Sequence, residues 1–176
     1  MHMHSLLAAA NRPQAFWGFM QSGVAFMDEK LTLTPCHCLA VRQAARQVTQ
    51  LYDRHLAPTG LRATQFALLS VLDRLGSLAV HELAAHLVMD RTATGRALRP
   101  LERDGLVRIG PGRDARTRAL SLTPAGHDRL EGARPLWEQA QSAFQAEYGE
   151  AEADALRRAL GRVVGRLPEP QEGRQA

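Results

Sequence analysis

Two neighbouring stretches of the chain carry arginine and threonine in a pattern that suits contact with duplex DNA. The first is a predicted helix over residues 90–104, and its candidate DNA-binding side chains are Arg91, Thr92, Thr94, Arg96 and Arg99. The second is a predicted hairpin, and its candidate DNA-binding side chains are Arg113, Arg116 and Arg118. One α-helix fits the major groove, where an arginine can bridge both acceptors of a guanine edge. The two stretches together predict a surface for double-stranded DNA.

The side chains within this surface have different expected roles. Arg96 projects from the middle of the helix and is expected to contact a base edge, with Thr94 as a second choice. Thr92 is expected to hold a phosphate. Arg116, and secondarily Arg113, are expected to enter the minor groove or hold its phosphates, because arginine follows groove width. The alternative is a solvated basic helix beside an ordinary hairpin, since arginine is common on protein surfaces.

Start and stop residues place the elements that position these side chains. Asp90 can cap the helix, and Gly105 stands where a C-terminal glycine belongs. Two β-type runs follow over residues 106–109 and 118–122. Thr123-Pro124 then begins another helix, with threonine as N-cap and proline at the first helical position. Within the 90–104 helix, Gly95 and Pro100 are unfavourable residues, and we expect a bend or a close backbone approach to DNA there.

The same stretch resembles the MarR family of bacterial winged-helix regulators. The residues that fit the wing signature are Asp114-x-Arg116-x-x-x-Leu120-x-Leu122-Thr123-x-x-Gly126. Those that fit the exit of the recognition helix are Leu101-Glu102-x-x-Gly105-Leu106-Val107. The resemblance extends over residues 36–167. It implies a mainly α (α+β) winged helix-turn-helix fold with a helical dimerisation domain. It also implies a homodimer that represses transcription by binding a pseudo-palindromic operator.

Periodicity extends this organisation over the rest of the 176 residues. We expect an N-terminal extension over 1–33, mobile or partly helical, and a disordered polar tail over 168–176. The other predicted helices cover 34–57, 63–75, 80–87, 124–148 and 150–167. Helices 34–57 and 124–167 carry long apolar stripes and are expected to dimerise, leaving 61–123 as the DNA-binding lobe. Ala79 replaces the usual cap before the 80–87 helix, so we expect Glu82 to lack its capping-box partner.

Composition permits a nucleic-acid partner and offers little to an enzyme. The formal net charge is +4, and Lys30 is the only lysine, so the basic side chains are almost all arginine. No G-x-S-x-G, phosphate-binding glycine loop or H-E-x-x-H is present. We therefore expect no enzyme and no cofactor; a dimerisation module of an enzyme is the alternative. His2 and His4 lack further ligands, so no metal is expected. The absence of a long apolar run and of a signal peptide predicts a cytoplasmic protein.

The family resemblance also implies an effector site under the first helix. In the family, small aromatic anions bind in the cleft between the dimer helices and the winged helix. The local candidate effector-binding side chains are His37, Arg42, Arg46, Tyr52 and Phe66. The basic groups could bind a carboxylate, and the two aromatic side chains could pack against a ring. The alternative is that the arginines are solvated or paired with acidic side chains.

Cys36 and Cys38 are the redox candidates, and they offer a competing switch. We expect both in the first turn of the 34–57 helix, where the positive dipole end favours thiolate. Residues two apart project to opposite sides of a helix, so a disulfide between them is poorly placed. Cys38 with Tyr52 resembles the peroxide-sensing branch of the family, but that branch's second tyrosine would fall at Ala63. Structural cysteines are the remaining alternative.

Overall fold

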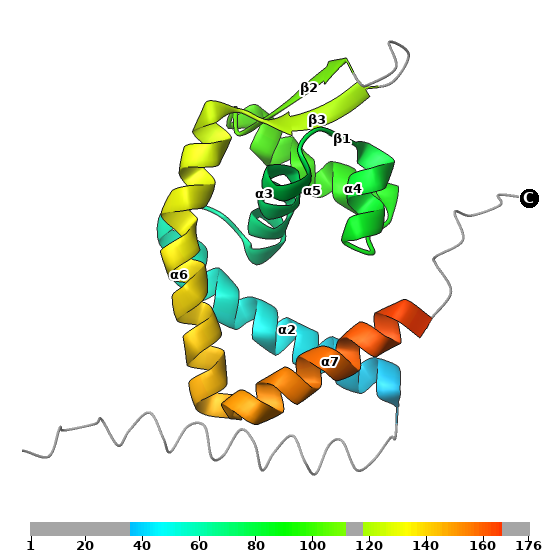
Figure 1. Ribbon diagram of the computed structural model, residues 1–176, viewed down its shortest axis with the longest axis vertical. Helices are drawn as coiled ribbons and strands as arrows, with labels where there is room; N and C mark the ends of the chain where they lie inside the picture. Colours follow the sequence, from blue (N-terminus) through cyan, green and yellow to red (C-terminus); the bar gives the residue numbers. More distant parts are fainter. Residues whose placement is uncertain (1–35, 112–117, 167–176) are drawn as a thin grey trace, which may run out of the picture. The chain divides into compact units, whose positions relative to one another are not determined.

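The computed structural model describes residues 36–111 and 118–166 (Figure 1). The chain divides into a first unit, Met1–Ala45, and a second unit, Arg46–Ala176. Helix α2 (His37–Leu56) contributes residues to both units. Its predicted start at Thr34-Pro35 lies outside the described residues. Cys36 precedes the helix, and its Sγ accepts the backbone N–H of Leu39 at 3.5 Å. Thus Cys36 stands at the cap position and not within the first turn.

The second unit contains a helix-turn-helix. After α2 come the short 3₁₀ helix η1 (Ala57–Thr59), α3 (Ala63–Leu75), α4 (Val80–His86) and α5 (Arg91–Arg103). The sequence did not predict η1, which forms where Pro58 ends the preceding helix and Gly60 adopts a φ of 75°. The predicted spans of α3, α4 and α5 agree with the structure to within one residue at each end. Helix α5 runs through both Gly95 and Pro100 without interruption.

A three-stranded antiparallel sheet adjoins these helices, in the order β1-β3-β2 (Figure 1). Strands β2 (Val107–Pro111) and β3 (Arg118–Leu122) form the predicted hairpin, with Ile109 opposite Leu120. Strand β1 (Leu78–Ala79) pairs with the other edge of β3. Sequence periodicity missed β1, because a strand of two residues is too short to alternate visibly. The sheet fixes the direction in which the hairpin leaves the helices.

One apolar core holds the helix-turn-helix and the sheet together. Helix α3 supplies more of its residues than any other element, as the nearly all-round apolar composition of this helix predicts. Its buried residues are Phe66, Leu68, Leu69 and Leu72. Leu98 and Leu101 of α5, Leu120 of β3 and Leu130 of α6 join the same cluster. Burial of these leucines, at roughly 1.5–3 kcal/mol each, fixes which face of α5 remains in solvent.

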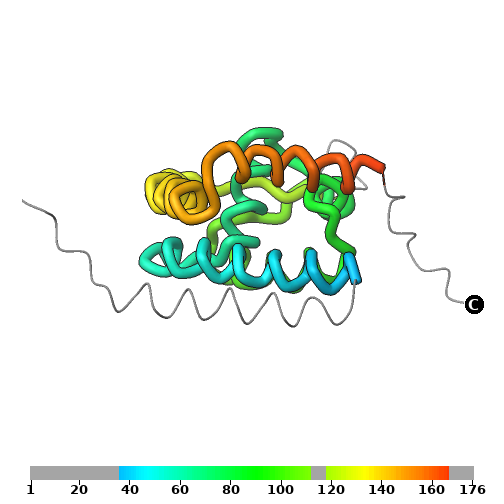
Figure 2. Tube along the Cα trace, turned by 90° about the horizontal axis from the view of Figure 1, so that it is seen from below, coloured from blue at the N-terminus to red at the C-terminus, as the bar shows by residue number. Residues whose placement is uncertain are grey.

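Two long helices complete the second unit. Helix α6 (Pro124–Tyr148) begins at the Thr123 cap, whose Oγ1 accepts the N–H of Gly126 at 3.0 Å. It packs on α3 through Leu130 and Ala133, and Arg129 Nη1 donates to the Thr59 carbonyl at 2.8 Å. Gly149, at a φ of 95°, separates it from α7 (Glu150–Arg166). Figure 2 views α6 nearly end-on, with α7 leaving it at an angle.

The cap of α4 is incomplete, as Ala79 at the N-cap position predicts. Glu82 occupies the capping-box position, and its Oε2 accepts the backbone N–H of Ala79 at 2.7 Å. This is the Glu half of a capping box. Ala79 offers no oxygen for the reciprocal bond, so the other half is missing. The helix therefore begins with one of its two possible capping bonds. Within the described residues, no helix is long and apolar enough to cross a membrane.

Candidate DNA-binding interface

Helix α5 has one buried face and one face of cationic and hydroxyl side chains. Asp90 caps the helix, since its Oδ1 accepts the N–H of Ala93 at 2.7 Å. Thr94, Leu98 and Leu101 are buried against the core. The exposed candidates on the other faces are Arg91, Thr92, Arg96 and Arg99. Thr92, Arg96 and Arg99 follow the i, i+4, i+7 spacing of a single helical face. One rigid helix thus presents two arginines and a threonine side by side.

Thr94 does not occupy the base-contacting position that the sequence analysis predicts for it. Its side chain is 0% exposed, and its Oγ1 donates to the Asp90 carbonyl at 2.9 Å. The hydroxyl is therefore satisfied inside the helix, and the residue occupies a core position between α5 and its neighbours. Its spacing of four residues to Leu98 was the available signal, because this places both on one face. Thr94 cannot reach DNA from this position.

The tip of the wing lies outside the described residues, and so do Arg113 and Arg116. Its base is described, and Arg118 is exposed there, opposite Pro111 on β2. Arg108 is also exposed, but its Nε donates to Ser121 Oγ at 3.1 Å on the opposite side of the hairpin from Ile109. Arg118 is therefore the basic residue of the described wing that shares a side with Ile109 and Leu120.

A groove of about 640 Å³ connects the wing to the helix-turn-helix. Its floor is apolar, with Val80, Ile109 and Leu120 among the lining residues. Its polar lining consists of Arg91 from α5, Arg118 from β3 and His81 from α4. Sequence reasoning missed His81, which lacks a motif. Its place near the start of α4 becomes informative only once β1 and β3 bring that helix beside the wing. Three donor-bearing side chains from three elements converge on this groove.

The candidate effector residues have separate surroundings. In the first unit, His37 and Arg42 are exposed on α2. In the second unit, Arg46 is exposed, and Tyr52 donates its hydroxyl hydrogen bond to Gln141 Oε1 of α6. Burial raises the pKa of Tyr52 above its usual range, so the phenol is neutral at physiological pH. Among the described residues, Arg46 forms no ion pair with an acidic side chain.

Phe66 is a core residue, contrary to its predicted role in packing an effector ring. It is 7% exposed and stacks on Trp137 of α6 with ring centroids 5.7 Å apart. Trp137 covers one face of the Phe66 ring, and a ligand ring on that face would have to displace Trp137 and expose apolar surface. The periodicity of α3 already favoured a core position, because Phe66 precedes Leu69 by one helical turn and both are buried.

Cys36 and Cys38 are both exposed and free. Cys38 is the second residue of α2, and Cys36 stands immediately before the helix. Ala63, the position expected to hold a second tyrosine in a peroxide sensor, donates its backbone N–H to Asp53 Oδ1 at 2.8 Å. It carries no hydroxyl with which to stabilise a thiolate.

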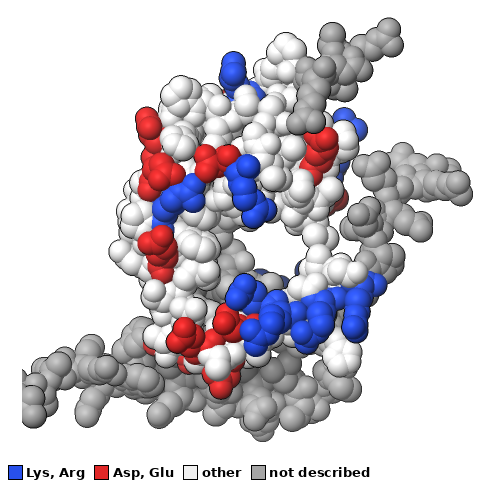
Figure 3. Space-filling view, in the orientation of Figure 1, with Lys and Arg blue, Asp and Glu red and all other residues white. Residues whose placement is uncertain are grey.

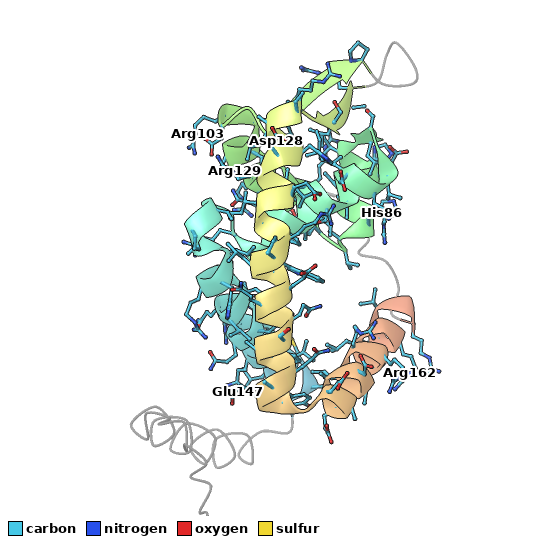
Figure 4. The ribbon with its side chains drawn as sticks, turned by 60° about the vertical axis from the view of Figure 1, so that its left-hand side comes forward. His86, Arg103, Asp128, Arg129, Glu147 and Arg162 are labelled. Atoms are coloured by element: carbon cyan, nitrogen blue, oxygen red, sulfur yellow. The ribbon has the colours of Figure 1, made fainter. Side chains whose placement is uncertain are left out.

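Charge is also concentrated away from the helix-turn-helix. Figure 3 shows basic side chains gathered along α7 and acidic ones near its start. The basic residues of this helix are Arg157, Arg158, Arg162 and Arg166. Figure 4 labels Arg162 on α7, Glu147 near the end of α6 and Arg103 on α5. The order of charges complements the α7 dipole, with acids first and bases last.

The fold and its exposed cationic helix define a winged-helix protein, a class that binds DNA. Residues 61–111 match the MarR family model. The chain is 30% identical over 132 residues to the transcriptional activatory protein BadR of Rhodopseudomonas palustris, covering 72% of this chain and 71% of BadR. The DNA-bound crystal structure of the M. tuberculosis transcriptional regulator MosR matches with 39% identity and a TM-score of 0.62, covering 75% of this chain and 99% of MosR.

A third comparison agrees in fold. The structure of a cysteine-to-serine mutant of E. coli MarR with operator DNA matches with a TM-score of 0.67 at 24% identity, covering 78% of this chain and 97% of that one. The chain therefore belongs to the MarR family, and it is a DNA-binding transcriptional regulator. The family resemblance and the mainly helical winged helix-turn-helix fold predicted from sequence are both confirmed. This family and fold are those of transcriptional regulators and not of enzymes.

Proposed function

We propose that this regulator binds a pseudo-palindromic operator as a homodimer, reading bases with α5 and holding the backbone with the wing. The observation that carries the proposal is the exposed face of α5, where Thr92, Arg96 and Arg99 stand on a helix capped and buried along its other side. A rigid helix of this kind can enter the major groove with its arginines toward base edges. Arg113 and Arg116 stay predictions for the minor groove.

The groove beside α5 suits a backbone phosphate. Arg91, Arg118 and His81 line it together, and all three can donate hydrogen bonds to phosphate oxygens. Because such contacts carry no sequence information, the groove would fix the position of α5 on the duplex. Loss of Arg118 should therefore weaken binding to all sequences by a similar factor and reduce the salt dependence by about one unit of slope.

A second copy of the chain is the proposed partner of the terminal helices. Helix α7 exposes Leu160, Val163 and Val164, which are 42%, 48% and 57% accessible. In the first unit, Leu39 and Val41 of α2 are similarly exposed. Contiguous apolar surface on a helix favours a protein partner. A dimer would place two α5 helices about one helical turn of DNA apart, roughly 34–36 Å. Scattering that gives a monomer mass at micromolar concentration would contradict this.

Selection from random duplexes tests the operator proposal directly. The full chain should enrich two inverted half-sites separated by about one helical turn. Binding should remain sequence-dependent at physiological salt, because base contacts persist when counterion release is weakened. Enrichment of no sequence, or of a single unrepeated half-site, would overturn the proposed dimeric recognition.

We propose repression as the direction of regulation, since an operator-bound dimer can block a promoter. BadR is an activatory protein, so the direction needs its own test. A promoter–reporter fusion with the chain supplied in trans should show lower expression than without it. Higher expression would assign activation.

For the effector we propose a small aromatic carboxylate. Arg46 is exposed and can make a bidentate contact with a carboxylate, and His37 and Arg42 are further basic groups of α2. BpsR of Bordetella bronchiseptica has a similar fold, and 6-hydroxynicotinic acid regulates its DNA binding. The ligand must bind the DNA-incompetent state more tightly, and a tenfold loss of operator affinity requires about 1.4 kcal/mol of such preference. Release of DNA should be measured with benzoate, 6-hydroxynicotinate and hydrogen peroxide.

A thiol switch is the second candidate, favoured by the exposure of Cys36 and Cys38 at the start of α2. Oxidation of Cys38 would replace a thiol by a polar group at that position. Ala63 and the engagement of Tyr52 with Gln141 weigh against it. We expect Cys36→Ser/Cys38→Ser protein to release DNA with its carboxylate effector, and Arg46→Ala to respond poorly. Peroxide release that Cys38→Ser alone abolishes would place the thiol switch first.

A further inference from the structure

Three metal-ligating side chains from two helices converge beside the wing. Asp73 comes from the last turns of α3, and His127 and Glu131 come from the first turns of α6. One donor atom from each residue lies within 4.8 Å of the other two. His127 Nδ1 is 3.1 Å from Asp73 Oδ1. The cluster is outside the proposed DNA-binding surface and uses none of its residues.

The His127–Asp73 pair has a spacing that suits a small divalent cation, and Glu131 would have to approach both donors to complete the set. His127 and Glu131 are four residues apart, which places them on one face of α6. Zinc binds histidine nitrogen and carboxylate oxygen at about 2.0–2.2 Å, so two tetrahedral ligands lie about 3.3–3.6 Å apart. The observed 3.1 Å between His127 and Asp73 needs to widen by only a few tenths of an ångström. Their side chains are partly exposed, which leaves a path for the ion.

Arg134 contacts the carboxylates of both Asp73 and Glu131 and orients them. Its Nη2 is 2.7 Å from Asp73 Oδ2, and its Nε is 2.5 Å from Glu131 Oε1. The guanidinium is charged at physiological pH, as arginine side chains are in proteins. Arg134 engages one oxygen of each carboxylate, and the second oxygen of Asp73, Oδ1, faces His127 Nδ1. Outer-shell partners of this kind orient ligands in metal sites. Two carboxylates against one guanidinium also leave a net negative charge.

The side of the cluster toward the wing is open to solvent. A shallow groove of about 450 Å³ is lined there by Asp73 and His127. Hydroxyl-bearing residues Ser77, Ser121 and Thr123 line the same groove. A cation held by three protein ligands completes a tetrahedron with one water, which this groove can admit.

From this arrangement we propose a zinc site formed by Asp73, His127 and Glu131, with a water as the fourth ligand. The bound ion would tie the end of α3 to the start of α6, replacing the hydrogen bond between His127 and Asp73. A ligand that binds the folded state alone stabilises it by mass action. Zinc should therefore raise the unfolding temperature of the protein in the absence of DNA.

Isothermal titration with Zn²⁺ tests the site in the full chain. The background should carry Cys36→Ser and Cys38→Ser, because thiolates bind zinc strongly. His127→Gln should lower the zinc stoichiometry by one and abolish the zinc-dependent rise in unfolding temperature. Glu131→Gln should weaken the same site at least tenfold. His86→Gln, an exposed histidine of α4, and Asp128→Asn, beside His127 on α6, are matched controls that should bind as the background does (Figure 4).

A spectroscopic readout separates loss of ligation from loss of fold. Co²⁺ in place of Zn²⁺ should give visible d–d absorption in the background protein and in His86→Gln, and none in His127→Gln. Circular dichroism of metal-free His127→Gln should match that of the background, because the residue is largely exposed. Equal zinc stoichiometry and equal Co²⁺ spectra in the background and in His127→Gln would overturn the proposal.

Discussion

Gly126, in the first turn of α6, lies directly against the backbone carbonyl of Leu106. A β-carbon at this position would overlap the Leu106 oxygen and lie 2.9 Å from its carbonyl carbon. The same corner holds two Thr123 contacts, in which Oγ1 donates to the Gly105 carbonyl at 2.7 Å and the backbone N–H donates to Leu106 O at 3.1 Å. The exit of α5 and the start of α6 are thus joined through backbone atoms that cannot move aside independently.

This contact predicts opposite effects for two glycine-to-alanine changes in one helix. Gly126→Ala should lower the free energy of unfolding by about 1–3 kcal/mol or more, because a backbone carbonyl must shift. Gly132→Ala, six residues on, meets nothing within 4 Å and should raise it by about 0.5–1 kcal/mol through helix propensity. Urea denaturation of both variants measures the difference. Equal effects at the two positions would show that the Leu106 contact does not limit packing.

The incomplete cap of α4 predicts a stabilising substitution. Ala79→Ser should add the missing bond to a backbone N–H and raise the free energy of unfolding by about 0.5–2 kcal/mol. The Glu82 half of the box is already formed, so the serine would complete it. Ala85→Ser, within the same helix and exposed, is the control and should be neutral or slightly destabilising. If both variants raise the denaturant midpoint relative to the parent protein, the capping argument is contradicted.

The elements of this fold were predictable where a strong local rule applied. Asp90 and Thr123 mark helix starts because their side-chain oxygens accept backbone N–H groups, and Gly105 marks a helix end through its positive φ; these ends agree with the structure. Strand β1 was not predictable, because its two residues become a strand only by pairing with β3. Thr94 was misassigned for a related reason. Its chemistry suits DNA, but the packing of α5 on the core decides which face it occupies.

The residues of α5 that form the site were predictable from the sequence, but the way in which other elements join them was not. The exposed arginines of α5 follow from helical spacing, while His81 joins Arg91 and Arg118 only because the sheet brings three elements together. Likewise, Asp73 and His127 are 54 residues apart in sequence, and they meet only because α3 packs against α6. Contacts of this range have no signature in a single sequence.

Val88 stands in the turn of the helix-turn-helix with a φ of 52° and is 55% exposed. A β-branched residue in the left-handed region is strained by about 1–2 kcal/mol. Val88→Asn should therefore raise the free energy of unfolding by about 0.5–1 kcal/mol, since asparagine tolerates this region and little apolar burial is lost. Val88→Thr keeps the branched β-carbon and is the matched control, which should leave stability unchanged. Thermal melts in which threonine and asparagine behave alike would argue against strain at this turn.

The hydroxyl of Tyr52 predicts a pH dependence of stability. Burial raises its pKa in the folded state, while the unfolded value stays near 10. Because the folded state favours the neutral phenol, this contribution is complete below about pH 10 and is lost as pH rises through the folded-state pKa. Tyr52→Phe should show a shallower alkaline loss of stability, and about 0.5–1.5 kcal/mol less stability at pH 7 from the missing bond to Gln141. Tyr148→Phe, an exposed tyrosine, should retain the parent's alkaline slope.

Base reading by Arg96 is the sharpest test of the proposed interface. Arg96→Ala should reduce affinity for the selected operator by about 1–3 kcal/mol and relax preference at one position per half-site, because a bidentate base contact disappears. Arg103→Ala removes an exposed arginine of the same helix that pairs with Asp104 at 2.9 Å, and it should bind nearly as the parent does. Arg96→Lys retains the charge but not the planar fork, so it should recover little specificity. The measurement is fluorescence anisotropy against the operator and against single-position variants at fixed salt. If Arg96→Ala weakens all duplexes equally and Arg96→Lys restores the affinity, Arg96 holds a phosphate, and base reading must belong to other residues of the exposed face.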